Sequence, residues 1–383
     1  MGFNINSHRE LSQVTTLEDP ALDIMKWGAT NSFPQTLKNI VEQSANAKPA
    51  VERTAKFYKG AGFDGEDEVV NQLGMTLKDI VSHCADELAL FDGFAIQVDF
   101  NLKGEIVSMT PLSLTDLRYK RIDTNYYSSM IGYHPNFGLN DDVKRTITTT
   151  PTKENIKFIH RFNPNNVIDQ IEKYTLGKYN GQILYYSGSG YSSYPVPTLQ
   201  APINFVLSDV ENSILVRKET STGFINTYLL KTMLDKESPV LEAIEAAIES
   251  AQGARGQGKV ITLSGLSPEE MNGTILEEIQ SGGADGTVIK SAKLTYDLDR
   301  EVIVGAYLIP PVLAGINISK GFSQNDLQEA YFVFNSITQE GRDIIEQHVN
   351  RLLKYSRFKT KNIKIKKLTL DVDEENIEGD NNK

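Results

Sequence analysis

A long amphipathic helix near the C-terminus constrains the fold of this chain more than any other feature. Apolar residues recur at helical spacing over the segment 324–355. Pro310 and Pro311 end an earlier helix, because proline lacks a backbone N–H and clashes with the preceding turn. The apolar face comprises Leu327, Ala330, Tyr331, Phe334, Ile337, Ile344, Ile345, Val349, Leu352 and Leu353.

Upstream of the prolines, helical and strand patterns alternate. We expect helices over 202–219 and 239–252, strands over 224–230, 259–263 and 287–290, and a helix from about Asp297 to Pro310. Ser238 followed by Pro239 is a strong helix start. Downstream of the long helix, residues 362–372 alternate as a strand and precede an acidic tail.

The first 200 residues predict an α+β unit. We expect a first helix that is opened by Trp27–Pro34 and ends near Ser44, a second helix over 49–58, and a third helix that begins after Thr76. Thr76 forms a capping pair with Asp79 at the start of the third helix. Strand patterns occupy 94–100, 105–109, 156–162 and 182–186, and the first two form a hairpin across Lys103 and Gly104.

Composition excludes several classes of protein. The chain has 383 residues, and 39 basic against 50 acidic side chains give 39 − 50 = −11 charges. Its one cysteine, Cys84, allows neither an internal disulfide nor a cysteine zinc cluster. The N-terminus lacks the features of a signal peptide, and Pro310 and Pro311 interrupt the longest apolar run, so we expect no membrane span.

No motif predicts catalysis, a cofactor or a metal site. Gly253–Lys259 (GARGQGK) has the spacing of a phosphate-binding P-loop, but Val260 replaces the Mg²⁺-binding hydroxyl, and the loop precedes a strand instead of a helix. His83 with Asp86 or Glu87 could share a helical face as metal ligands, although a solvated face is the favoured interpretation. The five histidines are otherwise scattered, so we expect no enzyme.

A basic run covers residues 351–367, with eight Lys or Arg and no acidic residue. Such a segment could contact nucleic-acid phosphates. The alternation of Ile363 and Ile365 with Lys364 and Lys366 equally fits a half-buried strand or an interface with an acidic neighbour. A half-buried strand or an interface with an acidic neighbour is favoured over contact with phosphates.

The segment Ala306–Glu329 (AYLIPPVLAGINISKGFSQNDLQE), followed by AYFVFNSITQEGRDIIEQHVNRLL, resembles a characteristic block of tailed-phage portal proteins. In that family a helix ends in an IPP-type element, and a polar loop then leads into a long helix. The upstream order of elements is also similar, as is the Trp27–Pro34 opening. The resemblance covers residues 200–355 and is compatible with the first 200.

The resemblance implies a ring-forming α+β protein with the parts of a portal subunit. These are a wing (1–200), a stem helix (201–222), a clip (223–292), a second stem helix (293–310), a tunnel loop (311–323), and a long wing or crown helix with a basic strand and acidic tail (324–383). The loop residues expected to face the DNA channel are Ile316, Asn317, Ile318, Ser319, Lys320, Gly321, Phe322 and Ser323. Lys320 would supply a brief phosphate contact and Phe322 a bulky tip.

The implied function is a dodecameric ring at one capsid vertex, through which double-stranded DNA is packaged and ejected. Expected partners are other copies of the chain, the terminase large subunit, a head-tail adaptor and the major capsid protein. The expected location is the virion, and the host cytoplasm during assembly. Twelve copies would carry 12 × −11 = −132 charges, which disfavours tight phosphate binding. The alternatives are a nucleic-acid-binding or capsid-associated protein using residues 351–367, and a degenerate P-loop NTPase.

Overall fold

The computed structural model describes residues 16–122, 128–139, 150–189, 194–222, 227–231, 237, 239, 259–263, 276–279, 287–316 and 324–370. The chain forms two compact units, which are described separately. The larger comprises Met1–Val206 with Val302–Lys383, and the smaller is Leu207–Glu301. No helix in the described ranges is long and apolar enough to cross a membrane.

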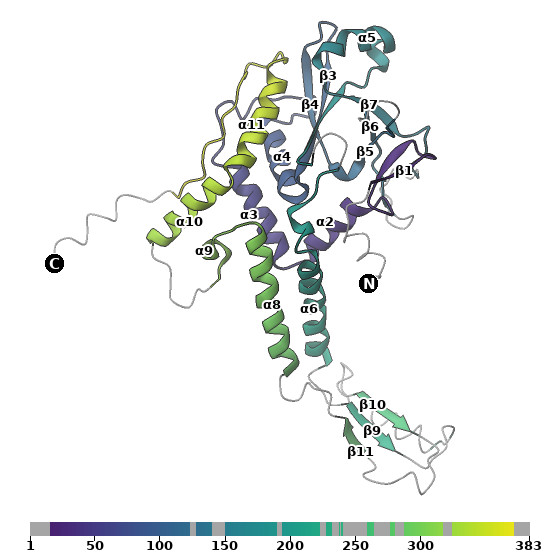
Figure 1. The fold of residues 1–383 in the computed structure, drawn as a ribbon, viewed down its shortest axis with the longest axis vertical. Coiled ribbons are helices and arrows are strands. Elements are labelled where there is room, and N and C mark those ends of the chain that lie inside the picture. Colours follow the sequence, from purple (N-terminus) through teal and green to yellow (C-terminus); the bar gives the residue numbers. More distant parts are fainter. Residues whose placement is uncertain are drawn as a thin grey trace, which may run out of the picture. The chain divides into compact units, whose positions relative to one another are not determined.

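A six-stranded sheet organises the larger unit (Figure 1). Its order is β4 (Ile106–Leu112), β3 (Gly93–Phe100), β8 (Gln182–Ser187), β7 (Lys157–Arg161), β6 (Met130–Tyr133) and β5 (Leu117–Tyr119). All neighbours are antiparallel except β7 and β8, which are parallel. The expected hairpin is β3–β4, and Gly104 in its turn has φ 76°. A short β1–β2 hairpin (Thr16–Asp19, Ile24–Trp27) precedes the helices.

Two helices supply most of the apolar side chains that cover this sheet: α4 (Leu77–Phe91) and α11 (Gln339–Leu353). A third helix, α3 (Ala47–Lys59), packs against both and contributes the partly buried Tyr58. The core joins Ile80 and Cys84 of α4 to Ile96 of β3 and Val349 of α11. Thr76 and Asp79 form the capping box that the sequence predicts. The other helices that lie wholly in the larger unit, within the described residues, are α2 (Phe33–Gln43), α5 (Val167–Tyr174), α9 (Pro311–Ala314) and α10 (Gln324–Ile337). Short 3₁₀ turns occur at Leu114–Asp116, Pro164–Asn166, Leu176–Lys178 and Thr198–Gln200.

The predicted long helix is divided in two, because the single residue Thr338 separates α10 (Gln324–Ile337) from α11. At the break, the Thr338 hydroxyl donates to the Phe334 carbonyl at 2.7 Å, a local bond that bends helices. Arg342, which is 1% exposed, donates to Thr338 Oγ1 and to the carbonyl of Phe57 at the end of α3. The break is thus fixed by the buried guanidinium.

The strand prediction for 362–372 is wrong over the described residues, which end at Leu370. Residues 361–370 form neither a helix nor a strand and join no sheet. Ile363 and Ile365 are buried as the alternation predicts, while the Ile363 N–H donates to Asn350 and the Lys366 N–H to the Gly62 carbonyl. The backbone N–H groups of this segment therefore bond to a side chain of α11 and to the loop at Gly62, and not to a neighbouring strand.

The smaller unit contains most of α6 (Ile203–Thr222) and α8 (Thr287–Ala306), whose ends continue into the larger unit. It also holds a three-stranded sheet in which β9 (Thr227–Lys231) lies between β10 (Lys259–Leu263) and β11 (Leu276–Ile279). The strand expected over 287–290 is wrong, because α8 begins at Thr287. The helix expected over 239–252 lies largely outside the described residues.

Candidate functional site

The predicted tunnel loop is described only at its two ends. Residues 317–323 lie outside the described ranges, whereas Ile316 is buried at 8% exposure. On one side, α9 ends at Gly315, a left-handed cap (φ 70°) whose N–H reaches the Val312 carbonyl. On the other side α10 begins at Gln324, and α9 packs against α10. The loop therefore connects two helices that are already in contact.

The backbone between the end of α8 and Pro310 has an unusual conformation. Leu308 has φ 53°, a left-handed conformation that costs a residue with a Cβ about 1–3 kcal/mol. It is held there because the Leu308 N–H donates to the Gly305 carbonyl at 3.0 Å and the Ile309 N–H to the Val304 carbonyl at 3.2 Å. The Leu308 side chain is nevertheless 63% exposed. A strained backbone here presents an apolar side chain to solvent.

Within the smaller unit, α6 and α8 pack through a polar seam. Asn212 Nδ2 donates to the Ala292 carbonyl at 2.7 Å. Asp299 is buried, and burial raises the pKa of its carboxyl group, although a hydrogen bond with Ser208 opposes the rise. Both helices also expose apolar side chains, and Leu294 and Leu298 are more than half exposed.

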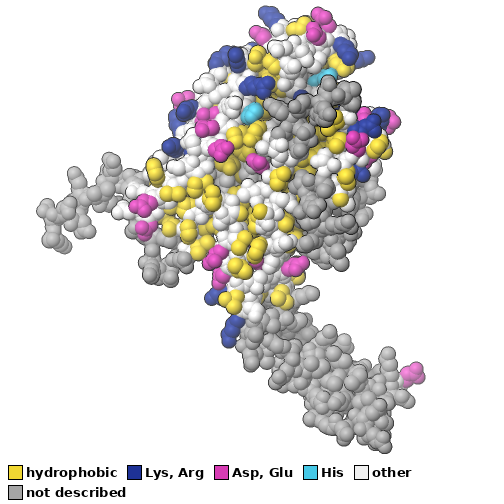
Figure 2. Space-filling model, in the orientation of Figure 1, with side chains coloured by type: hydrophobic (Ala, Val, Ile, Leu, Met, Phe, Trp, Pro, Cys, Tyr) yellow, Lys and Arg dark blue, Asp and Glu magenta, His cyan; other side chains and the backbone are white. Residues whose placement is uncertain are grey.

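A second set of exposed apolar side chains lies on α10. Phe332 is 73% exposed, with Val333 and Ile337 also exposed, while Phe334 on the opposite side is buried against Phe57. Figure 2 shows hydrophobic side chains gathered over the region where Figure 1 places α10. Contiguous exposed apolar surface marks an interaction site in soluble proteins.

The basic run 351–367 meets an acidic loop of the same chain. Lys366 Nζ lies 2.7 Å from Asp64, and the carboxylate of Glu68 accepts hydrogen bonds from the Lys359 and Thr360 N–H groups. Hydrogen bonds from these groups lower the pKa of Glu68 although burial opposes them. These contacts favour an intramolecular acidic neighbour over nucleic-acid phosphates for this part of the run.

The Trp27–Pro34 opening has a packing role. Trp27 stacks on Tyr194 with ring centroids 4.5 Å apart, and the backbone N–H of Trp27 donates to Asn31 Oδ1. Arg118, which is fully buried, donates to the Asn31 carbonyl at 2.8 Å. The motif thus ties the first helix to β5 and the region before α6.

The structure describes Lys259 of the GARGQGK segment and Glu87 of the histidine–carboxylate set. Lys259 is the first residue of strand β10, whereas a P-loop lysine opens a helix, and residues 253–258 lie outside the described ranges. Glu87 is buried and accepts hydrogen bonds from Ser113 Oγ and the Leu114 N–H. No group of three potential metal ligands gathers in the part of the chain that the structure describes.

Comparison with solved structures identifies the class of fold. The chain superimposes on a protein in the virion of a native gene transfer agent particle, with TM-score 0.52, 12% identity, and coverage of 88% of this chain and 84% of that one. A protein from the neck of the empty particle gives TM-score 0.52, 11% identity, and coverage of 87% and 84%. No protein-family model and no curated protein matches the sequence.

An HK97-family phage portal protein from Corynebacterium diphtheriae also matches, with TM-score 0.40, 12% identity, and coverage of 82% of this chain and 88% of that one. The weight of the comparison rests on the two gene-transfer-agent proteins. The chain shares the fold of the two gene-transfer-agent proteins. A phage portal protein is among the structural matches, in agreement with the resemblance seen in the sequence.

Proposed function

We propose that this chain is a structural portal subunit, twelve copies of which form a ring at one capsid vertex. The observation that carries the proposal is a fold shared over 88% of this chain and 84% of a virion protein. In this assignment residues 1–200 form the wing, α6 and α8 the stem, β9–β11 part of the clip, and 311–323 the tunnel loop. The ring would occupy the virion and assemble in the host cytoplasm.

The surface chemistry supports a ring. Apolar side chains exposed on the helices of both units suit burial against neighbouring copies, as closed rings of heterologous contacts require. The ring would conduct double-stranded DNA during packaging and ejection. A separate terminase would hydrolyse ATP at the clip, a head-tail adaptor would bind there later, and the major capsid protein would surround the wing.

Native mass with negative-stain imaging tests the assembly. Twelve subunits of 42.7 kDa give a ring of about 510 kDa with a central hole. A protein that stays monomeric both alone and when co-expressed with its capsid protein contradicts the proposal.

The tunnel loop is tested by Lys320→Ala combined with Phe322→Ala. Rings should still assemble, while packaging and ejection decline because the channel loses its cation and bulky tip. The matched control is Leu102→Ala with Lys103→Ala, an equivalent pair in the exposed β3–β4 turn. Unchanged packaging and ejection in the Lys320/Phe322 variant would show that the loop is assigned wrongly.

The nucleic-acid-binding alternative makes a different prediction. A small oligomer using residues 351–367 would bind DNA tightly, with affinity that falls steeply as salt rises. The contacts of Lys366 with Asp64 and of Glu68 with the Lys359 backbone favour the portal proposal over this alternative.

A further inference from the structure

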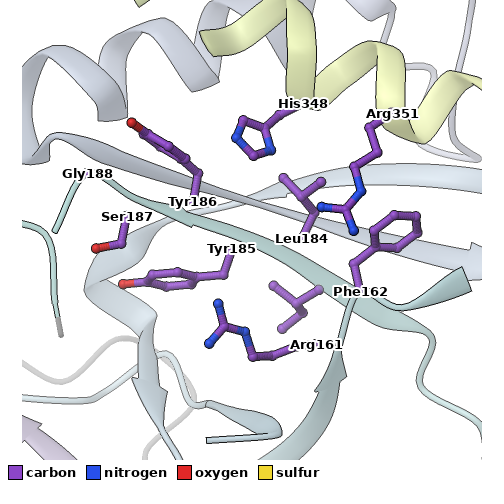
Figure 3. A pocket seen from close by; sticks show the side chains of 10 residues that line it. Arg161, Phe162, Leu184, Tyr185, Tyr186, Ser187, Gly188, His348 and Arg351 are labelled. Atoms are coloured by element: carbon purple, nitrogen blue, oxygen red, sulfur yellow. The ribbon is translucent and has the colours of Figure 1, made fainter. Parts of the chain in front are cut away.

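A cavity of about 340 Å³ lies where β7 diverges from β8 (Figure 3). Six consecutive residues, 183–188, line it. Because successive side chains of a strand point to opposite faces, a cavity lined by every residue of a run follows the backbone edge of the strand. We call this cavity the β8-edge pocket.

The sequence explains why this edge is open. The parallel β7–β8 ladder has two residue pairs, and it ends where the Phe162 N–H donates to the Ile183 carbonyl at 2.8 Å. The next donor in the ladder would be residue 164, which is a proline and has no N–H. The chain turns away there into the 3₁₀ turn Pro164–Asn166.

The backbone of Tyr185 faces the pocket. Backbone groups of alternate residues point to the same edge of a strand, so those of Tyr185 point as those of Ile183 do, away from β3. Within the described residues, no strand pairs with β8 on this side beyond Ile183. Such an edge is a template for an added strand.

The lining of the pocket is cationic. Arg351 and His348 reach it from α11 and Arg161 from the end of β7, and none of its described lining residues is acidic. The Arg351 guanidinium lies 5.3 Å from the centre of the Phe162 ring. His348 Nδ1 is buried and has no hydrogen-bond partner in the structure. Burial and the nearby Arg351 lower the pKa of His348, so the positive charge of the lining comes from Arg161 and Arg351. In a chain of net charge −11, this pair of arginines selects a carboxylate-bearing occupant.

We propose that the β8-edge pocket binds a short part of residues 371–383 of this chain as an added strand. That segment carries six acidic residues and one lysine: Asp371, Asp373, Glu374, Glu375, Glu378, Asp380 and Lys383. Its start continues an alternation, with Leu370 and Val372 on one side and Asp371 and Asp373 on the other. A strand with one apolar and one acidic side matches a pocket lined by Leu184 and Phe162 as well as by cations.

The segment is long enough to reach the pocket. Asn335 Nδ2 donates to the Leu368 carbonyl at 2.8 Å, which places the start of the tail beside α10. His348 lies thirteen residues farther along α10 and α11, about 20 Å at 1.5 Å per residue. Thirteen extended residues span up to about 43 Å.

The test uses the protein truncated after Leu370 and a fluorescent synthetic peptide of residues 369–383. Fluorescence anisotropy should show that the peptide binds the truncated protein and binds the full chain more weakly, because the attached tail competes. Arg351→Glu should weaken binding by about tenfold or more, since it reverses a charge that lines the pocket.

Two controls separate strand addition from general charge attraction. Lys354→Glu changes an exposed cation of the same region that does not line the pocket, and should leave the affinity unchanged. A peptide N-methylated at alternate residues keeps its charges but cannot pair with β8, and should not bind. Absence of peptide binding, or equal losses in Arg351→Glu and Lys354→Glu, overturns the proposal.

Discussion

Gly341 lies in α11 where Tyr58 of α3 covers the helix backbone. A Cβ built at Gly341 would lie 2.2 Å from Tyr58 Cε1, well inside contact distance. We therefore expect Gly341→Ala to lower the free energy of unfolding by about 1–3 kcal/mol, the usual cost of overpacking. Urea denaturation of the purified protein measures the loss.

Gly305 provides the matched control for this substitution. It also lies in a helix, but no atom lies within 4 Å of its Cβ position, so Gly305→Ala should stabilise the protein by about 0.5–1 kcal/mol. Adding Tyr58→Ala to Gly341→Ala should cost less than the sum of the single changes. Additive losses would show that Tyr58 does not cause the clash.

Asp92 makes stability depend on pH. Burial, with the nearby charge of Glu340, raises the pKa of its carboxyl group to about 6. The folded chain therefore binds this proton more tightly than the unfolded chain, so stability falls as pH rises toward 6 and stays reduced above it. Asp92→Asn removes this charge and is compatible with the left-handed backbone at φ 60°.

Melting temperatures at pH 4.5 and pH 8 test this expectation. The variant Asp92→Asn should be more stable than the parent at pH 8, and the difference should shrink at pH 4.5. Glu340→Gln should shift the transition to lower pH by removing the like charge. A stability difference that is independent of pH would assign the effect to packing instead.

At the scale of elements, Leu308 connects α8 to α9 at a backbone cost. Because Asn adopts the left-handed region more readily, Leu308→Asn should raise the unfolding free energy by roughly 0.5–1.5 kcal/mol. Leu102→Asn is the control, since Leu102 is equally exposed and has no positive φ. If both variants gain the same stability, polarity rather than backbone strain is the cause.

Predictions from the sequence succeeded where local patterns agree with packing. The Thr76–Asp79 box, the β3–β4 hairpin and the break at Pro310 and Pro311 depend on neighbouring residues, and the structure contains all three. The strand expected over 287–290 was wrong because β-branched Thr, Val and Ile after a glycine loop favour a strand locally. The structure places them in the first turn of a twenty-residue helix.

The other errors arise from long-range contacts. The helix break at Thr338 depends on Arg342 reaching Phe57, which is 285 positions away in sequence. The β8-edge pocket requires Pro164 to end one strand beside another that continues. No local pattern encodes such pairings, and the loop residues 317–323 remain a prediction.

At the scale of the whole molecule, the fold is shared with gene-transfer-agent proteins at about one identical residue in eight. What persists at 12% identity is the arrangement of the backbone over 88% of this chain. Surface residues such as Phe332 do not need to pack into the core of a monomer, so the fold alone does not require them to be apolar. Their exposure therefore reports on assembly more directly than the core does.

Phe332→Asp on α10 tests whether this surface holds the proposed ring together. Burying a phenylalanine contributes about 1.5–3 kcal/mol, and each subunit of a ring has two neighbours, so one substitution weakens every interface. Native mass should fall from the twelve-subunit value toward 42.7 kDa, with an unchanged circular-dichroism spectrum. Leu73→Asp, at an 80% exposed loop position, should leave the rings intact. Rings that persist in Phe332→Asp would place the contacts between subunits elsewhere, and the exposed α8 residues Leu294 and Leu298 would then be the next to change.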